Sequence, residues 1–211
     1  MGMETYHKIQ TVFKRDPETK FKTLLEGEYS LPEFDYLKNN KWVFTEKVDG
    51  TNIRVMWDGL ELRFKGKTDA AEIPKPLFVR LKERFTESIM AEHFGIENTG
   101  VCLYGEGYGA KIQKGGGNYR KDQDFVLFDV DIDSWWLKRS CVKDISKNLN
   151  IDIVPVVGSG TLIDMVEMCK NGFKSGWGDF QAEGFVARPE VELRGRNGQR
   201  IITKIKCKDF K

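Results

Sequence analysis

The hydrophobic positions of this chain recur with two periods, one of three to four residues and one of two, and they predict helices set among strands. Across 76–93 the apolar residues return every three or four positions, which predicts a single helix that Gly95 ends. The stretches 51–57 and 60–65 are apolar-rich and are separated by Asp58-Gly59, so they predict a hairpin with a tight turn.

The rest of the chain continues this mixture of strands and helices. The expected strands are 101–106, 125–132, 151–157 and 183–187, and the expected helices are 138–148 and 162–171. A second hairpin is expected over 192–210, because Asn197-Gly198 is the strongest short turn signal. Strands outnumber helices, and neither a repeat nor a linker divides the sequence. We therefore predict an α+β fold of mostly antiparallel sheets flanked by helices, with 1–211 as one domain in which the role of 1–40 is unassigned.

Composition and charge narrow the class of protein further. Hydrophobic residues make up 40% and charged residues 31% of the 211 positions, as in an ordinary globular domain. No apolar run approaches the roughly 18 residues of a membrane span, and residues 1–13 are too polar for a secretory signal, so a cytoplasmic protein with no membrane partner is expected. The net charge of +2 excludes a strongly basic nucleic-acid coat. The four cysteines lack a Cys-x-x-Cys pair and there are only two histidines, which argues against zinc and favours buried, reduced thiols.

The most informative stretch is 46–52, which reads Glu-Lys-Val-Asp-Gly-Thr-Asn. Lys47 stands at the end of an apolar run and two residues before Asp49-Gly50, a step that breaks a strand into a tight turn. The lysine is therefore expected at a strand end, where a pocket can hold it. An unprotonated lysine amine can attack a phosphorus or carbonyl centre. A surface lysine beside an ordinary turn is the alternative, and this motif alone does not decide between them.

Later segments offer carboxylates and an aromatic side chain that phosphoryl transfer could use. Glu106 lies between two glycines and Glu183 precedes one, so a ligand could approach the backbone beside each acid. Both could equally be solvent-facing carboxylates. Phe128 could stack on a nucleobase or pack in the core.

The last of these segments is a lysine-rich stretch, 203–210. Strand alternation would place Lys204, Lys206 and Lys208 on one face. Three like charges on one face could bind an anion such as a triphosphate, or they could protect an exposed sheet edge.

The order of these segments is more specific than any one of them. Their order resembles the five ordered motifs of the covalent nucleotidyltransferases, the superfamily of ATP-dependent ligases and mRNA capping enzymes. In this chain the five motifs read Lys-x-Asp-Gly-x-Asn, Gly-Glu-Gly, Phe-Asp, Glu-Gly-x-Val and Lys-x-Lys. The resemblance spans 47–208, and within the superfamily the chain is most similar to ATP-dependent RNA ligases of the RNA ligase 2 type. The residues typical of that branch are Asn52, Phe128-Asp129 and Lys-Cys-Lys at 206–208. The branch includes phage enzymes, and a phage-encoded protein would be expected in the cytoplasm of the host cell.

The resemblance implies a chemistry and a set of residues. Lys47 would attack the α-phosphate of ATP, form lysyl-AMP, and pass the AMP to a 5′-phosphate end of RNA, after which a 3′-OH would seal the nick in a duplex. ATP and Mg²⁺ or Mn²⁺ are the implied cofactors, and Glu183 is the implied metal ligand. Lys206 and Lys208 would grip the α-phosphate, with Lys204 as an alternative in register. The other residues implied to bind the cofactor are Glu46, Asn52, Lys67, Glu106 for the ribose and Phe128 for adenine.

The sequence departs from the family pattern in two places. Relatives carry an arginine where Lys67 stands, with Arg63 nearby, and a lysine cannot make the bidentate contact of an arginine with a 5′-phosphate. Most ligases of this superfamily also carry an appended C-terminal domain. The sequence predicts none after Lys208, so a minimal or truncated enzyme or one that relies on a partner protein is expected.

Other functions remain open at this stage. A DNA ligase, an mRNA-capping guanylyltransferase and a nucleic-acid-binding module without catalysis share the same motif order or fold. The run Gly115–Gly117, with Lys111, Lys114 and Arg120 beside it, lacks the spacing of a Walker loop. It predicts a mobile loop that could contact a nucleic-acid backbone.

Overall fold

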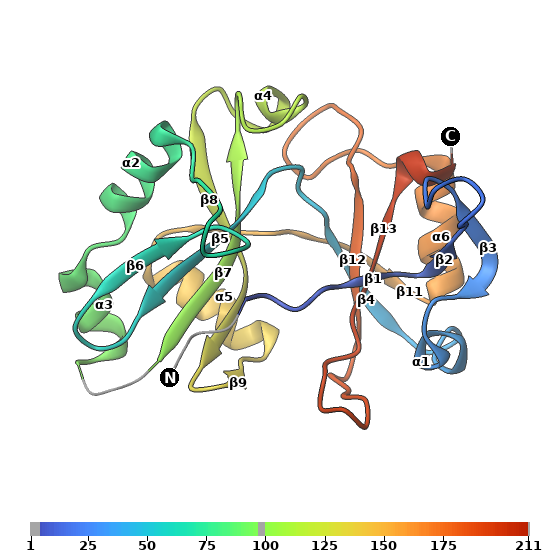
Figure 1. Cartoon of the computed structure of the whole chain (residues 1–211), viewed down its shortest axis with the longest axis horizontal. Helices are drawn as coiled ribbons and strands as arrows, with labels where there is room; N and C mark the ends of the chain where they lie inside the picture. The colour runs from blue at the N-terminus through green and yellow to red at the C-terminus, as the bar shows by residue number, and fades with distance from the viewer. Residues whose placement is uncertain (1–4, 97–99, 211) are drawn as a thin grey trace. The chain divides into compact units, whose positions relative to one another are not determined.

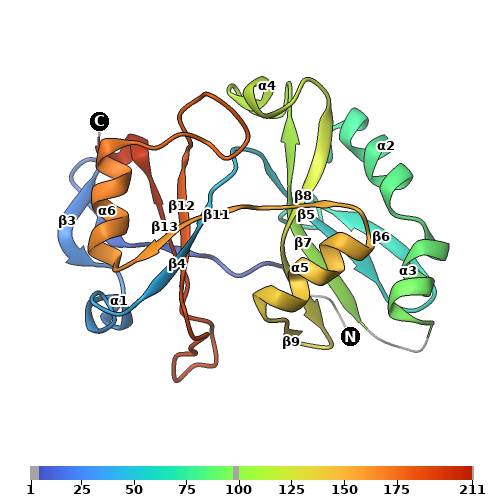
Figure 2. The ribbon, with the colours of Figure 1, turned by 180° about the vertical axis from the view of Figure 1, so that it is seen from behind.

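The computed structural model describes residues 5–96 and 100–210, and the chain divides into two compact units. The first unit contains the residues up to His7 together with Asp49–Val154, and the second contains Lys8–Val48 together with Pro155–Lys211. Figure 1 and Figure 2 show the elements of each unit from opposite sides. That residues 1–211 act as one adenylyltransferase domain stays a prediction.

The first unit is built on a sheet with the strand order β10-β8-β7-β5-β6, in which β9 pairs with β8. Its strands are β5 (Thr51–Trp57), β6 (Leu62–Lys65), β7 (Val101–Gly109), β8 (Gln123–Ile132), β9 (Trp135–Trp136) and β10 (Asp152–Ile153), and its helices are α2 (Lys75–Arg84), α3 (Glu87–Phe94), α4 (Gly116–Tyr119) and α5 (Arg139–Asn148). Only β10 runs parallel to its neighbour among the described pairs of this sheet. The core joins Ile53 and Leu127 of the strands to Leu81 of α2 and Val142 of α5.

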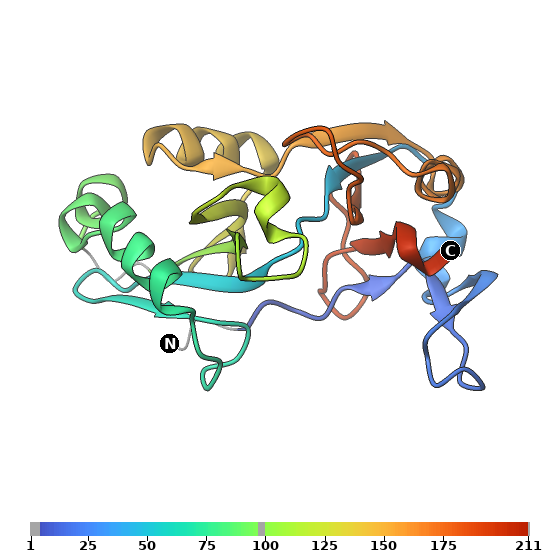
Figure 3. The ribbon, with the colours of Figure 1, turned by 90° about the horizontal axis from the view of Figure 1, so that it is seen from above.

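The second unit contains a sheet with the order β1-β13-β12-β4-β11 and a separate pair, β2-β3. Its strands are β1 (Gln10–Thr11), β2 (Phe13–Arg15), β3 (Leu24–Tyr29), β4 (Trp42–Glu46), β11 (Val156–Gly160), β12 (Gly184–Pro189) and β13 (Thr203–Lys206), and its helices are α1 (Pro32–Tyr36), α6 (Leu162–Asn171) and the 3-10 helix η1 (Cys207–Phe210). Trp42 and Phe44 of β4 pack with Phe185 of β12 and with Met165 of α6. Figure 3 shows β13 running into η1 beside the C-terminal label.

The α+β class with mostly antiparallel sheets is confirmed. The two sequences at 138–148 and 162–171 form α5 and α6, and 125–132 lies inside β8, an interior strand. The first hairpin is also confirmed, but four residues rather than two join its strands, because the Asp58 carboxylate accepts from the N–H groups of Leu60 and Glu61 and closes a wider loop.

The prediction of one helix over 76–93 is wrong. The chain forms α2 and α3, and Phe85 between them has extended backbone. Thr86 begins α3 as its N-cap, since its hydroxyl accepts from the N–H of Ile89. The apolar spacing continues across the break, so periodicity alone could not reveal it. Gly95 ends α3 with φ 80°, as predicted.

The strand expected over 151–157 is also divided. β10 pairs with β8 in the first unit, and β11 pairs with β4 in the second. Pro155 lies between them and has no N–H to give to a ladder. The apolar run therefore supplies one short strand to each of two sheets.

The hairpin expected over 192–210 has a different partner strand. A turn does form at Asn197-Gly198, where Gly198 has φ 77°. An isolated antiparallel β-bridge joins the backbones of Arg194 and Arg200 on either side of it. The extended partner of β13, however, is β12, with Phe185 opposite Ile205. Residues 190–202 thus form a long connection with its own tight turn.

The composition led to two further expectations, that the cysteines are buried, reduced thiols and that no segment spans a membrane. The four cysteines are free thiols, of which Cys141 is exposed and not buried as expected. Cys169 and Cys207 are buried with their sulfur atoms 3.0 Å apart. Within 5–96 and 100–210, no helix has the length and apolar character needed to cross a membrane.

Candidate active site

Lys47 lies directly after β4, and the backbone of the sheet fixes its position. Trp42, Phe44 and Glu46 are buried, so alternation along the strand sends Lys47 to the opposite face. The N–H of Lys47 donates to the carbonyl of Gly184 at 2.9 Å, which extends the β4–β12 ladder by one residue. The lysine is therefore at a strand end, as predicted, and its side chain is only 21% exposed.

Glu183 joins Lys47 to a second lysine. Its Oε2 atom lies 2.6 Å from Nζ of Lys47, and its Oε1 atom lies 2.6 Å from Nζ of Lys206. The register explains this arrangement, because β12 runs between β4 and β13 and Gly184 lies opposite Lys206. Backbone hydrogen bonds on both sides of Glu183 hold the three residues at one end of the sheet. We call Lys47, Glu183 and Lys206 the lysine–glutamate cluster.

The expectation that three lysines share one strand face is wrong for Lys208. β13 ends at Lys206, and the N–H of Cys207 bonds to the carbonyl of Glu183 as the chain turns into η1. Lys208 is exposed on that 3-10 helix. Lys204 does share the strand with Lys206, so the alternation holds for these two alone.

Glu46 was expected to bind the cofactor, but its carboxylate is engaged within the protein. It is 1% exposed and accepts from the hydroxyl of Ser175 at 2.6 Å and from the N–H of Gly176 at 2.7 Å. Burial raises the pKa of Glu46, and these two hydrogen bonds oppose the rise. Glu46 thus ties the strand that precedes Lys47 to the loop that leads to Glu183. Ser175 was not foreseen, since a loop serine carries no distinctive sequence signal.

The first unit brings together Asn52 and Glu106, which are cross-strand partners on β5 and β7. Both side chains are half-buried. The Oδ1 atom of Asn52 is buried and accepts no hydrogen bond within the described part of the chain. An unfilled acceptor of this kind costs free energy, which favours a ligand or water that donates to it.

Phe128 lies on β8 of the same unit, and an aromatic side chain from the N-terminal segment contacts it. The ring of Tyr6 meets Phe128 edge-on at 5.0 Å, and the Tyr6 hydroxyl donates to Asp129 at 2.8 Å. Tyr104 and Trp136 complete this group. The sequence showed no motif over 1–40, so Tyr6 was missed.

Lys67 is exposed in the loop after β6, and a buried arginine holds that loop. Arg54 is 1% exposed; its Nε donates to the carbonyl of Gly66 at 3.1 Å, and its Nη2 lies 2.5 Å from Asp69. Arg63, considered as an alternative to Lys67, pairs with Asp58 instead. A charged residue among the apolar positions of β5 was the available signal for Arg54.

Gly50 is required by the packing at the turn after Lys47. A Cβ atom placed there would lie 2.2 Å from the carbonyl oxygen of Gly107 and 2.7 Å from Cγ of Glu106. We expect Gly50→Ala to lower the free energy of unfolding by about 1–3 kcal/mol, because backbone of β7 would have to shift. Denaturant unfolding followed by circular dichroism measures this difference.

Gly117→Ala is the matched control for this substitution. A Cβ at Gly117 would meet no atom within 4 Å, and an alanine in a helix is preferred to a glycine. The control should therefore keep or slightly raise the stability. Equal effects of the two substitutions would contradict the packing argument.

The charged groups of the second unit bear on a metal site. Over 5–96 and 100–210, no group of three or more His, Cys, Asp or Glu side chains is placed to hold a metal ion. Glu183 is a lone carboxylate whose two oxygens each face an ammonium group. Among the described residues Glu183 is thus a candidate oxygen ligand next to Lys47, and substrate phosphates would have to complete the set around Mg²⁺.

Comparisons with known proteins identify the family and the fold. A family model described as RNA ligase matches residues 40–206, which include the whole lysine–glutamate cluster. Among curated protein sequences, no relative matches the chain.

Solved structures of an RNA ligase from Naegleria gruberi have a similar fold. The structure with PPi has a TM-score of 0.66 at 19% identity and covers 97% of this chain. A point mutant with ATP and Mn has a TM-score of 0.63 at 20% identity and covers 83%. A second mutant, with AMP and Mn, has a TM-score of 0.65 at 19% identity and covers 97%. The matched part is 57%, 52% and 57% of the Naegleria chain in these three comparisons.

Proposed function

Since this chain belongs to the RNA ligase family, we propose that it is an ATP-dependent RNA ligase of the RNA ligase 2 type, in which Lys47 carries AMP to a 5′-phosphate end of RNA. The observation that carries the proposal is the lysine–glutamate cluster: one amine tethered by the sheet, with a carboxylate and a second ammonium group beside it. The motif order that contains these residues supports the same function.

The first step joins Lys47 to the nucleotide. The unprotonated Nζ attacks the α-phosphorus of ATP, an N–P bond forms, the bond from that phosphorus to the bridging oxygen breaks, and pyrophosphate leaves while the amine gives up a proton to solvent. Lys206 contributes a positive charge where negative charge develops on the α-phosphate. Lys208 is proposed to help from η1.

The second and third steps transfer the AMP and seal the RNA. A 5′-phosphate oxygen attacks the phosphorus of lysyl-AMP, the N–P bond breaks, and the amine takes up a proton. The 3′-OH oxygen then attacks the 5′-phosphorus, the phosphodiester forms, the hydroxyl proton passes to solvent, and AMP leaves. Lys67 is proposed to contact the 5′-phosphate, and a nicked duplex is the proposed substrate.

The first unit is proposed to contribute the contacts to the nucleoside. Glu106 would accept from the ribose hydroxyls, and Phe128 would stack on adenine. Asn52 has a buried acceptor atom that a ligand group could fill. Glu46 acts from within the protein, by holding the Ser175–Gly176 loop.

Glu183 is the proposed protein ligand of a divalent metal ion, and phosphate oxygens of the nucleotide would supply further ligands. Mg²⁺ and Mn²⁺ bind carboxylate and phosphate oxygens, and Glu183 is the carboxylate that this chain offers next to Lys47. Such an ion, when bound, would neutralise charge on the phosphates. The Naegleria structures with ATP or AMP and Mn support ATP and a divalent cation as the cofactors here.

Intact-mass spectrometry tests the proposed function. We expect one AMP per chain after incubation with Mg²⁺ and ATP, and no comparable adduct with GTP. A GMP adduct instead would indicate a capping-type guanylyltransferase, and an unmodified mass with both nucleotides would indicate a binding module. Sealing of a nick with an RNA 3′-OH strand, tested beside a DNA 3′-OH strand, separates RNA ligase from DNA ligase. A partner protein or a further domain would be needed if the adduct forms and no sealing follows.

A further inference from the structure

The backbone that follows Lys47 is held by a segment far along the chain. The N–H of Asp49 donates to the hydroxyl oxygen of Tyr119 at 3.3 Å, and the Gly50 carbonyl accepts from Nε2 of Gln113 at 3.1 Å. Gly50 itself rests on the backbone of Gly107. One donor and one acceptor of the turn are therefore engaged by residues 110–120, which we call the glycine segment.

The glycine segment, for which the sequence predicted a mobile loop, contains a short helix and backbone hydrogen bonds. Residues Gly116–Tyr119 form α4, and the N–H of Ala110 bonds to the carbonyls of Arg120 and Asp122. A Cβ at Gly116 would lie 1.9 Å from the carbonyl oxygen of Gly109, so the start of α4 packs directly against the backbone that precedes the segment.

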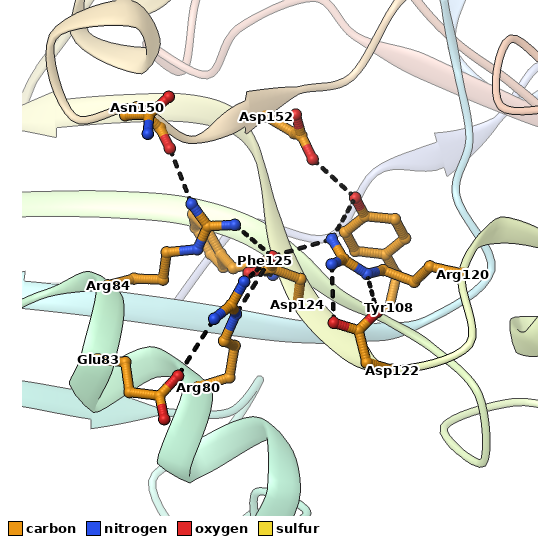
Figure 4. A network of polar contacts seen from close by, with 10 residues as sticks. All are labelled: Arg80, Glu83, Arg84, Tyr108, Arg120, Asp122, Asp124, Phe125, Asn150 and Asp152. Atoms are coloured by element: carbon orange, nitrogen blue, oxygen red, sulfur yellow. Dashed lines mark hydrogen bonds and ion pairs between the residues drawn. The ribbon is translucent and has the colours of Figure 1, made fainter.

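Arg120 anchors the end of the segment, as Figure 4 shows. Its guanidinium forms a two-pronged ion pair with Asp122, at 2.6 and 2.9 Å, and a third contact with Asp124 at 2.9 Å. The hydrogen bond with Asp122 raises the pKa of Arg120, so the arginine stays charged. Asp124 is 1% exposed, and Arg84 from α2 also pairs with it, at 2.5 Å. A buried carboxylate shared by several guanidinium groups is a rigid base for the segment.

Tyr119 is placed by the same base. Its ring meets Tyr108 edge-on at 6.1 Å, and the hydroxyl of Tyr108 donates to Asp152 at 3.0 Å. The ring of Tyr119 is therefore held by its contact with Tyr108, and its hydroxyl accepts from the N–H of Asp49. Gln113, in contrast, is exposed and reaches the turn only with its amide group.

We propose that Tyr119 and Gln113 are positioning residues for the adenylylation step: they hold the Asp49–Gly50 turn, which begins two residues after Lys47 in the chain. The inference rests on the proposed function of Lys47. Lys47 is itself held by the Gly184 carbonyl and by Glu183. Without Tyr119 and Gln113, the turn that follows Lys47 loses two hydrogen bonds, and attack on phosphorus is sensitive to displacements of about 1 Å.

The test uses Tyr119→Phe, Gln113→Ala and the double variant in the full chain. Tyr119→Phe keeps the ring and removes only the hydroxyl oxygen that accepts from Asp49. We expect the single-turnover rate of AMP attachment to fall about tenfold in each single variant and by about a hundredfold in the double variant, with the ATP concentration for half-maximal rate changed less than about twofold. Amide hydrogen exchange at Asp49 should quicken about tenfold in Tyr119→Phe.

Asn118→Ala is the matched control, because Asn118 is an exposed residue of the same helix α4. It should match the wild type in rate and in exchange at Asp49, and all variants should keep the thermal unfolding temperature within a few degrees. Wild-type rates in the double variant, or loss of rate through weaker ATP binding alone, would overturn the inference while leaving the proposed function intact. A wild-type chain that takes up no AMP would overturn both, and exchange at Asp49 would still report whether Tyr119 holds the turn.

Discussion

Replacement of Lys47 by alanine is expected to abolish the AMP adduct, a loss of more than about 10⁴-fold in the rate of its formation. In the proposed first step, the amine nitrogen of Lys47 is the protein atom that becomes bonded to phosphorus, so its removal leaves AMP without an attachment point. Lys206 is held on the other oxygen of Glu183, and its own strand and partner fix it there. Intact mass after incubation with Mg²⁺ and ATP measures the adduct directly.

Two further variants sharpen this test. Lys47→Arg keeps a positive charge beside Glu183 but removes the nucleophilic amine, so it should also form no adduct. Lys41→Ala removes an exposed lysine at the opposite end of β4, where it pairs with Glu190 at 2.6 Å, and should leave adduct formation unchanged. An adduct of normal yield in Lys47→Ala would refute the role of Lys47, and mapping the modified peptide would then locate the true nucleophile.

Much of the architecture could be predicted because its signals are local. The run 162–171 has a capping box at its start, with Thr161 and Asp164 bonded to each other's backbone, and it forms the expected helix. The Asp-Gly step after Lys47 placed the lysine at a strand end. The break at Thr86 and the division at Pro155 were missed because the apolar pattern runs through both, and only the pairing of distant strands decides where such a run is cut.

The candidate site was predicted in part for the same reason. The order of the motifs indicated that Lys47, Glu183 and Lys206 belong to one site, and the structure brings them together. The resemblance implied that Glu46 binds the cofactor, but a strand alternates its side chains, and the Glu46 carboxylate accepts from Ser175 and Gly176 on the face opposite to Lys47. Lys208 was assigned by extending that alternation past the true end of β13.

Contacts between distant residues could not be predicted from one sequence. Tyr119 reaches Asp49, and Ser175 reaches Glu46, across separations of 70 and 129 positions. No local pattern encodes such a pair, because each partner is an ordinary turn or loop residue by itself. In the glycine segment, likewise, the sequence could not reveal that Arg120 pairs with the buried Asp124.

Glu183→Gln carries the second large expected effect, a fall of about 10²-fold in the rate of AMP attachment. The amide has the size of the carboxylate but cannot pair with two ammonium groups at once, so Lys47 and Lys206 would repel each other and lose their shared partner. The stability should change by no more than about 2 kcal/mol, since all three side chains keep some contact with water. Single-turnover adenylylation and denaturant unfolding separate these two effects.

Glu190→Gln is the matched control, because Glu190 follows the opposite end of the same strand β12 and pairs with Lys41, the residue before β4. Each of the two glutamates faces a lysine at 2.6 Å, but only Glu183 bridges two. If the bridge matters, Glu190→Gln should react at the wild-type rate and Glu183→Asp should fall between wild type and Glu183→Gln, because a shorter carboxylate keeps the charge and loses the reach. Equal rates in Glu183→Gln and the wild type would contradict the proposed role of Glu183. The side chain of Lys47 would then need neither the negative charge nor the ion pair of Glu183 in order to react.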